Sequence, residues 1–233
     1  RKTVSGFVHL HLHSGYSLLD GACRINEIAE AAAREGHCAV ALTDHGAMYG
    51  AVEFYRACKA AEVKPIIGCE VYVAPKSRFD RDPAAKYNHL VLLVENEIGY
   101  RNLCRMVSLS FTEGFYSKPR VDYELLTEYS EGLIALSGCL GGIVPSMILA
   151  SDFDGALREA ERLRDIFGKD SFYLELQDHG MPEQKKVNRA LLEISGRSGI
   201  PLVATNDVHY IRRSDAGAQR VLMAIAMQST ADE

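Results

Sequence analysis

Three histidines alternate near the start of the chain, in the segment HLHLH at residues 9–13. The run 8–12 is typical of a β-strand, and alternation on a strand places His9, His11 and His13 on one face. Buried neutral histidines each need a hydrogen-bonding partner, so three together make a poor core. Because imidazole is the commonest nitrogen ligand of protein-bound metals, we interpret this segment as one wall of a metal site rather than as a solvated edge strand.

Acidic and imidazole side chains recur after the first strand and after later predicted strands. Each is a weak signal alone, because an Asp-Gly pair usually marks a turn and a single Asp-His pair has many uses. Their repetition after successive strands favours one shared site. These residues are Asp20, Asp44, His45, Asp207 and His209.

Three further candidates depend on their surroundings. Glu70 has apolar neighbours on a run that is typical of a buried strand, and a buried carboxylate without a cation or donor is costly. His89 opens the next strand, and taken alone it is more often a packed or surface histidine. Cys139 follows a strand and alone is more often a structural thiol, although its thiolate would suit zinc.

Nucleophilic schemes fit the sequence less well. No Gly-x-Ser-x-Gly elbow is present. A pair of Cys139 with a histidine would leave the other polar residues unexplained. The glycine-rich segment 138–142 lacks the lysine of a phosphate-binding loop. A metal-based chemistry therefore accounts for more of the chain.

Short apolar runs alternate with helical patterns, an order typical of a parallel sheet covered by helices. Polar residues follow the strands in nearly every unit. This favours an α/β barrel, whose site is built from many strand ends, over an open sheet with a single switch point. The predicted strands are 8–12, 39–43, 65–73, 90–94, 133–136, 172–176 and 201–204. The predicted helices are 25–35, 51–61, 96–110, 154–167, 183–198 and 215–227.

Composition narrows the class of protein. A length of 233 residues suits one barrel domain, and six cysteines without a C-x-x-C pair indicate a reducing, cytoplasmic setting. The net charge of −5 argues against DNA binding by charge alone, although bound cations can reverse the field inside a site. No apolar run is long enough for a membrane span. The polar segment 76–86 is expected to be an exposed loop, and the aromatic and basic segment 112–120 is expected to be a long loop.

Several long phrases resemble the polymerase-and-histidinol-phosphatase (PHP) family, and most closely the PHP domains at the N-termini of bacterial DNA polymerase III alpha subunits. The resemblance covers the whole chain. It implies a distorted (β/α)7 TIM-like barrel, a single domain over residues 1–233, and an N-terminal position in a longer polymerase chain. The phrases are FVHLHLHSGYSLLDG, ALTDHGAMYGAVEFY, KPIIGCEVYVAP, EGLIALSGCLGG, FYLELQDHG and PLVATNDVHY.

The resemblance also implies a cluster of two to three divalent metal ions, which could be zinc, manganese or iron. Every ligand position of the family carries a residue able to bind metal here, which favours an active site over a relic. His9 lies outside this ligand set. The first ion would be held by His11, His13, Glu70 and Asp207, the second by Glu70, His89 and Cys139, and the third by Asp20, His45 and His209.

The implied activity is metal-dependent phosphodiester hydrolysis, in the form of a 3′–5′ proofreading exonuclease acting on the primer 3′ end of DNA. Asp207, His13 and Glu70 would form the catalytic centre. The parent chain would be a DNA-directed DNA polymerase. Residues considered for substrate contact are Lys118 and Arg120 for phosphate and Tyr16 or Tyr116 for base stacking, with a packing role equally open for each.

Two other functions remain open at this stage. The domain could be a silent scaffold, stabilised by its metals, that supports the polymerase or docks a separate exonuclease subunit. It could also be a free-standing phosphomonoesterase of the histidinol-phosphatase type, which the polymerase-like phrases disfavour.

Overall fold

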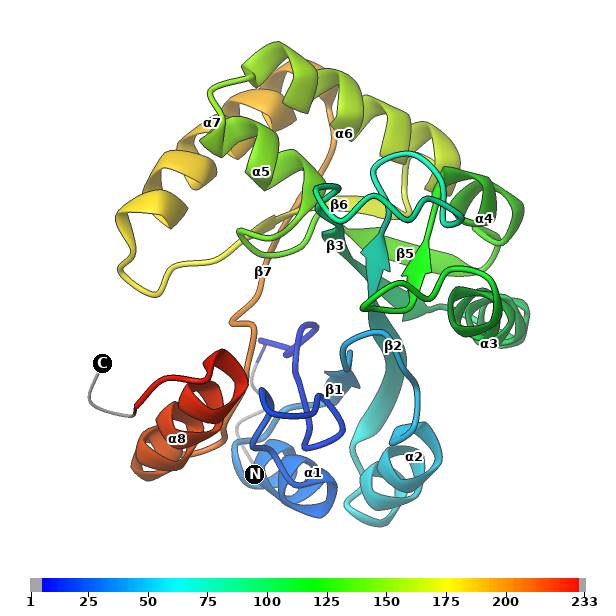
Figure 1. Ribbon diagram of the computed structural model, residues 1–233. Coiled ribbons are helices and arrows are strands. Elements are labelled where there is room, and N and C mark those ends of the chain that lie inside the picture. The colour runs from blue at the N-terminus through cyan, green and yellow to red at the C-terminus, as the bar shows by residue number, and fades with distance from the viewer. Residues whose placement is uncertain (1–5, 231–233) are drawn as a thin grey trace.

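A curled sheet forms the inside of the molecule and helices cover its outside (Figure 1) in a computed structural model that describes residues 6–230. Residues 1–5 and 231–233 of the predicted domain lie outside the described range. The strands follow the order β1-β2-β3-β5-β6-β7, with β4 paired to β2. Their bounds are β1 Ala39–Leu42, β2 Lys64–Val73, β3 Asn88–Val94, β4 Arg120–Val121, β5 Leu133–Leu136, β6 Phe172–Leu176 and β7 Leu202–Ala204.

The helices lie close to their predicted positions, and two short ones, α4 and α5, were not predicted. Local signals fix several ends: Asn96 caps α3 by accepting from the Gly99 amide, and α7 stops at Gly199, whose φ is +71°. Asn26, a residue type that favours helix N-caps, lies inside α1, and Arg24 precedes this helix. The bounds are α1 Ile25–Arg34, α2 Ala51–Ala60, α3 Glu97–Thr112, α4 Tyr123–Glu128, α5 Ile143–Leu149, α6 Phe153–Phe167, α7 Pro182–Ser198, the 3₁₀ turn η1 Arg213–Asp215 and α8 Ala216–Met227.

The predicted first strand, 8–12, is an extended segment held by single bridges rather than a regular strand. His9 bridges Val40 of β1, and Leu12 bridges Val208 just after β7. The His13 amide donates to the Val208 carbonyl at 2.8 Å. The segment therefore spans the gap between the first and last strands and gives a distorted barrel instead of an open sheet.

The sheet is mixed, which corrects the expectation of an all-parallel barrel. Strand β3 runs antiparallel to both β2 and β5. The connection from β2 to β3 contains no helix, so the chain turns back directly instead of crossing over. The first residues of β3 consequently lie at the same end of the barrel as the last residues of β2 and β5.

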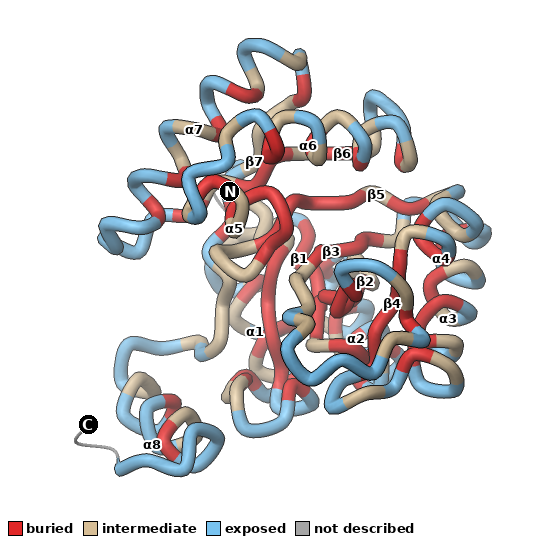
Figure 2. The backbone as a smooth tube through the Cα atoms, turned by 45° about the horizontal axis from the view of Figure 1, so that its top comes forward, coloured by how far each residue is buried: buried red, intermediate tan, exposed pale blue. Residues whose placement is uncertain are grey.

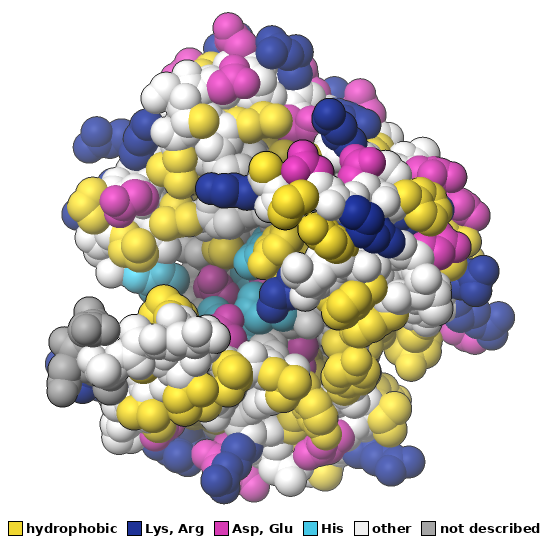
Figure 3. Space-filling model, viewed as in Figure 1, with side chains coloured by type: hydrophobic (Ala, Val, Ile, Leu, Met, Phe, Trp, Pro, Cys, Tyr) yellow, Lys and Arg dark blue, Asp and Glu magenta, His cyan; other side chains and the backbone are white. Residues whose placement is uncertain are grey.

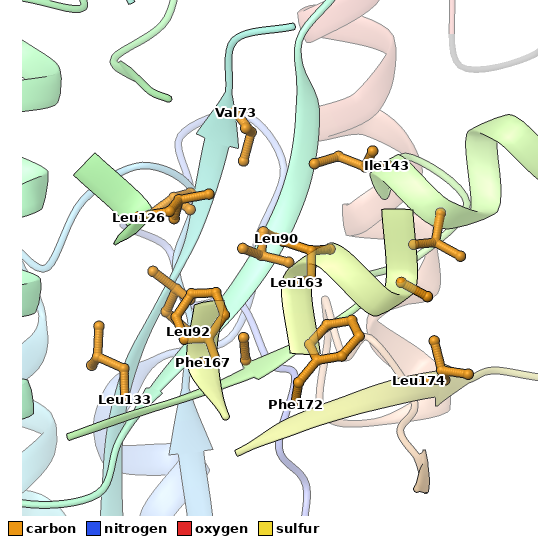
Figure 4. Packing of buried hydrophobic residues seen from close by; sticks show 14 of the residues in the cluster. Val73, Leu90, Leu92, Leu126, Leu133, Ile143, Leu163, Phe167, Phe172 and Leu174 are labelled. Carbon is orange, nitrogen blue, oxygen red and sulfur yellow. The ribbon is translucent and has the colours of Figure 1, made fainter. Parts of the chain in front are cut away.

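Apolar packing fixes the helices on the sheet. The larger cluster lies between the sheet and α3 to α7, where Leu90 and Leu92 of β3 pack near Leu163 and Phe167 of α6 and Phe172 of β6 (Figure 4). A second cluster joins α1 and α2 to β1. Figure 2 shows the buried strands inside and the exposed helix surfaces outside. Full burial of each such side chain contributes roughly 1.5–3 kcal/mol.

Two arginines in these segments are buried: Arg78, contrary to the expectation that segment 76–86 is exposed, and Arg120 at the end of segment 112–120. Arg78 forms ion pairs with Glu113 at 2.7 Å and Asp122 at 3.0 Å. The Arg120 guanidinium donates to the carbonyls of Gly114, Arg78 and Asp80. These contacts fasten segment 76–86 to the segment that follows α3.

Within residues 6–230 the helices are all too short or too polar to cross a bilayer.

Candidate metal centre

Nine potential ligands meet at one end of the barrel, where Figure 3 shows histidines and carboxylates inside a hollow. These side chains come from the extended first segment, the turn after it, strands β2 and β3, and the loops that follow β1, β5 and β7. The reversed direction of β3 explains why a residue at its beginning joins residues that follow other strands. The ligands are His11, His13, Asp20, His45, Glu70, His89, Cys139, Asp207 and His209.

Glu70 occupies the middle of this group on β2 and is fully buried. Its Oε1 lies 3.0 Å from His89 Nδ1 and 3.4 Å from His11 Nε2, and its Oε2 lies 2.5 Å from His45 Nδ1. Burial by itself would raise the pKa of Glu70, but His89 and His11 hold the pKa well below its usual range. The carboxylate therefore stays ionised, with one oxygen on each side of the group.

Asp207 brings a second carboxylate to the same imidazoles. Its Oδ1 lies 3.2 Å from the Nε2 atoms of both His11 and His13. Burial raises the pKa of Asp207, but the charge of His11 and the contact with His13 lower it well below normal. The backbone of Asp207 has a φ of +47°, a left-handed conformation that aspartate tolerates better than most residues.

Asp20 joins two further histidines near the opening. Its Oδ2 lies 2.7 Å from His45 Nε2 and 3.4 Å from His209 Nε2. Burial lowers the pKa of His45, but the carboxylates of Asp20 and Glu70 more than offset this and raise the pKa to about 9. Without a cation, His45 therefore carries a proton between two carboxylates.

Cys139 approaches the group from the loop after β5. Its Sγ lies 3.9 Å from both Glu70 Oε1 and His89 Nδ1. Burial, followed by the nearby charge of Glu70, raises the pKa of the Cys139 thiol. The sulfur thus stays protonated unless a cation replaces the proton, as it does when thiolates bind metals.

Five buried polar atoms at this end have no hydrogen bond of good geometry among the described residues, and each can offer a lone pair to a cation that displaces any proton held there. Such atoms are costly when buried alone. Three triplets of potential ligands have atoms within 4.8 Å of one another: His11, His13 and Glu70; His45, Glu70 and His89; and His13, His45 and His209. The donor set therefore fits more than one divalent ion. The five atoms are His11 Nε2, His13 Nε2, His45 Nδ1, Glu70 Oε2 and Asp207 Oδ1.

A second layer of polar groups orients two of the imidazoles. His11 Nδ1 lies 2.7 Å from Glu175 Oε1, which leaves Nε2 with its lone pair toward the centre. The Ser17 hydroxyl donates to Asp44 at 2.7 Å, so its oxygen accepts from His13 Nδ1 at 3.1 Å. Hydrogen bonds of this kind fix the tautomer of metal-binding histidines.

Sequence reasoning assigned no role to Glu175 or Ser17. Glu175 carried a usable signal, because it is a carboxylate between apolar residues on a buried strand, the same argument that singled out Glu70. No comparable pattern marks Ser17, whose role depends on a turn that folds back on His13.

His9 lies away from the centre, although the alternation placed it on the same face as His11 and His13. Its ring packs edge-on against Phe7 and His37, with centroids 5.0 Å and 5.2 Å away. The regular alternation fails because the segment is bridged at single points instead of forming a continuous strand.

A cavity of about 430 Å³ opens over the cluster, and its lining includes Asp20, His45, His89, Tyr16 and Lys118. Lys118 is exposed, with Nζ 5.3 Å from the centre of the Tyr72 ring. The Tyr16 hydroxyl donates to Glu53. These two of the predicted substrate contacts therefore border the opening.

Arg120, the third predicted contact, does not border it. Its guanidinium is buried and satisfied by backbone carbonyls, which is contrary to the expectation that it contacts phosphate. Tyr116 faces Arg81 and Arg120 instead of the cavity.

The DNA polymerase III alpha subunits of Treponema pallidum (strain Nichols) and Borreliella burgdorferi are 50% and 48% identical to this chain over 94% and 95% of its length. The subunit of Thermus aquaticus is 48% identical over 97%. The chain spans about a fifth of these relatives, 19% of each.

Solved structures share the fold at low sequence identity. A putative metal-dependent phosphoesterase from Bifidobacterium adolescentis superposes with a TM-score of 0.53 at 15% identity, covering 89% of this chain and 90% of that one. An amidohydrolase from Chromobacterium violaceum with bound sulfate gives 0.51 at 16% identity, covering 87% of each. The profile of the PHP domain matches residues 9–179. By sequence and fold, this chain belongs to the PHP domain family.

Proposed function

We propose that this chain is a metal-dependent phosphodiesterase domain of a bacterial replicative DNA polymerase, acting in the cytoplasm as a 3′–5′ proofreading exonuclease. The observation that carries the proposal is the set of five buried donor atoms facing one another at the open end of the barrel. The similarity to DNA polymerase III alpha subunits supports a DNA substrate.

The ligand assignment that we propose uses two to three ions of zinc, manganese or iron. His11, His13 and Asp207 would share the first ion with Glu70, which bridges to the second. Divalent ions held here would supply positive charge that lowers the pKa of water and stabilises a phosphoryl group. The second ion would also contact His89 and Cys139, and the third would be held by Asp20, His45 and His209.

The protein's own groups prepare this centre. Glu175 and Ser17 keep the Nε2 lone pairs of His11 and His13 directed inward. Glu70 and Asp207 supply negative charge that offsets the charge of bound cations. Lys118 at the opening could pair with a backbone phosphate, and Tyr16 offers a ring face for a base.

A scaffold function is a second candidate. The ligands come from both the first segment and the segment after β7, so bound metal would fasten the barrel even without catalysis. The net charge of −5 also disfavours strong DNA binding by the isolated domain. In that case the domain would support the rest of the polymerase or dock a separate exonuclease subunit.

Hydrolysis assays separate these functions. Metal-loaded protein should shorten a primer with a mismatched 3′ end and hydrolyse bis(p-nitrophenyl) phosphate, a substrate that needs no grip on DNA. Asp207→Asn and His13→Ala should lose more than the roughly 10–100-fold typical of changes behind the ligands. The exposed change Asp154→Asn on α6 serves as control. Assays at low salt favour phosphate contacts.

The outcomes are distinct. An inert metal-loaded wild type on both substrates would favour the scaffold. Full activity in both ligand variants would mean that the hydrolysis comes from a contaminant and that the assigned centre is wrong. Activity confined to phosphomonoesters such as histidinol phosphate would favour the phosphatase alternative.

A further inference from the structure

Three aromatic side chains form an exposed row beside the metal centre. Tyr49 is 64% exposed, Phe111 is 37% exposed and Phe115 is 53% exposed. The Tyr49 and Phe111 ring centroids lie 6.4 Å apart, and those of Phe111 and Phe115 lie 6.3 Å apart. We call these three residues the aromatic strip. Exposed apolar rings gathered in this way mark a binding surface more often than chance packing.

The aromatic strip is continuous with the cavity over the metal ligands. Tyr49 and Phe111 line this cavity together with Asp20, His45 and His89. Figure 3 shows hydrophobic side chains bordering the hollow on the side of α2 and α3. A ligand that reaches the metal ligands can therefore extend over the strip without leaving the surface.

Lys118 lines the cavity and belongs to the same loop as Phe115. Arg120 holds this loop by donating from its buried guanidinium to the Gly114 carbonyl at 3.1 Å. A side chain at position 114 would collide with the Arg120 carbonyl, so the turn requires glycine. The loop thus presents a ring and a cation in fixed positions beside the opening.

We propose that the aromatic strip binds the bases of an unpaired nucleic-acid strand while Lys118 contacts its backbone. This proposal rests on the phosphodiesterase function proposed above and adds its specificity. Base stacking on exposed rings, combined with a cation along the backbone, is how proteins hold single strands without reading sequence.

The chemistry of the strip favours this occupant over two others. A small phosphomonoester would fill the cavity and leave the strip unused. A paired duplex end exposes only the outer face of its last base pair and cannot offer successive base faces to Tyr49, Phe111 and Phe115. An unpaired 3′ end offers both a phosphodiester to the metal ligands and free base faces to the strip.

Equilibrium binding of the 233-residue chain tests the proposal. The probe is a fluorescent thymidylate strand of about 15 nucleotides, within the range of single-strand site sizes, measured by anisotropy in EDTA so that no cleavage occurs. Tyr49→Ala and Phe115→Ala should each weaken binding roughly 5-fold or more. Tyr100→Ala, on α3 and 39% exposed, is the matched control and should change binding less than about 2-fold.

An abasic strand of the same length carries the same phosphates without bases. Wild type should bind it more weakly than thymidylate, and the two strip variants should lose that difference. Equal binding of the two strands by wild type would overturn the proposal. Absence of measurable thymidylate binding by wild type would also overturn it and would point to a protein partner for these rings. An equal loss in Tyr100→Ala would overturn it too, because the effect would not be specific to the strip.

The proposed hydrolytic function is tested separately. Phe115→Ala should keep kcat/KM for bis(p-nitrophenyl) phosphate within about 2-fold of wild type, because the cavity lining includes Tyr49 and Phe111 of the strip but not Phe115. Loss of strand binding with intact hydrolysis supports the strip. If the variants bind the strand as wild type does, the strip proposal is overturned and the hydrolytic proposal stands. If wild type is inert in hydrolysis but its strand binding depends on bases, the hydrolytic proposal is overturned and the strip proposal stands.

Discussion

Glu175 is not one of the proposed metal ligands but contacts one of them, His11, so replacing it by glutamine removes a charge behind a ligand. Its Oε1 lies 2.7 Å from His11 Nδ1 and accepts from Gln177, and its Oε2 accepts from the Gly138 amide at 3.0 Å. Both oxygens therefore face N–H donors. A glutamine in this place must turn its own amide nitrogen toward one of those donors, whichever way it is oriented.

Two effects of Glu175→Gln have different magnitudes. Loss of the charge behind His11 makes Nε2 a weaker ligand, and changes at such positions typically lower metal affinity about 10–100-fold, or roughly 1.4–2.7 kcal/mol. The mismatched donor leaves one buried group unsatisfied, which costs about 1–3 kcal/mol of metal-free stability. The variant should therefore have both a lower affinity for zinc and a lower free energy of unfolding in the metal-free state.

Competition with a fluorescent zinc chelator measures the affinity, and urea unfolding of the metal-free protein measures the stability. Glu97→Gln, which removes an exposed carboxylate on α3, is the control and should match wild type in both. Unchanged zinc affinity in Glu175→Gln, with reduced metal-free stability, would refute the view that Glu175 acts on the metal through His11.

Three further predictions concern bound metal, the protonation of His45 and the buried side chain of Arg120. Removing metal with EDTA should lower the melting temperature by about 5–10 °C, and zinc or manganese should restore it, because ions bound at 100 times their Kd add about 2.7 kcal/mol; an unchanged thermal scan would argue against bound ions. In metal-free protein, His45 is buried but is raised to a pKa of about 9 from 6.5 by Asp20 and Glu70, so its contribution to the free energy of unfolding is full below pH 6.5 and lost as pH rises through 9; urea titrations of His45→Asn should lack that decline. Arg120→Met should lose at least about 2 kcal/mol in urea unfolding because buried carbonyls lose their donor, whereas the exposed Arg105→Met should not.

Periodicity and end signals determined much of the fold in advance. The strands Leu133–Leu136 and Phe172–Leu176 have the predicted bounds, and α7 ends where Gly199 allows a left-handed turn. These features depend on residues within a few positions of one another. Local pattern is therefore enough to predict them.

Features set by distant partners were not predictable. The direction of β3 depends on which neighbours it pairs with, and an apolar run reads the same in either direction. Arg78 and Arg120 look like surface residues in sequence, and only the folded chain supplies their buried partners. The short helix α5 follows the glycine-rich segment 138–142 and has only seven residues, too few for a helical pattern to stand out in the sequence.

The candidate site also has a part that the sequence predicted and a part that it did not. Donor residue types after successive strands indicated which side chains would gather, and the structure brings those side chains into contact distance. The groups behind them depend on how turns fold back, as Ser17 does beneath His13. Residue type alone cannot reveal such a relation.

The seam of the barrel has a consequence for assembly. Residues 9–13 meet the segment after β7 through only a few backbone bonds, and His13 and Asp207 face each other across it. A cation bound there would link parts of the chain nearly 200 residues apart. Bringing the ends of so long a loop together costs conformational entropy, which the bound cation would offset. The ring can close only after its last strand has folded. A cation bound by both His13 and Asp207 would therefore find its complete set of ligands only after that strand is in place, and its removal would weaken this junction directly.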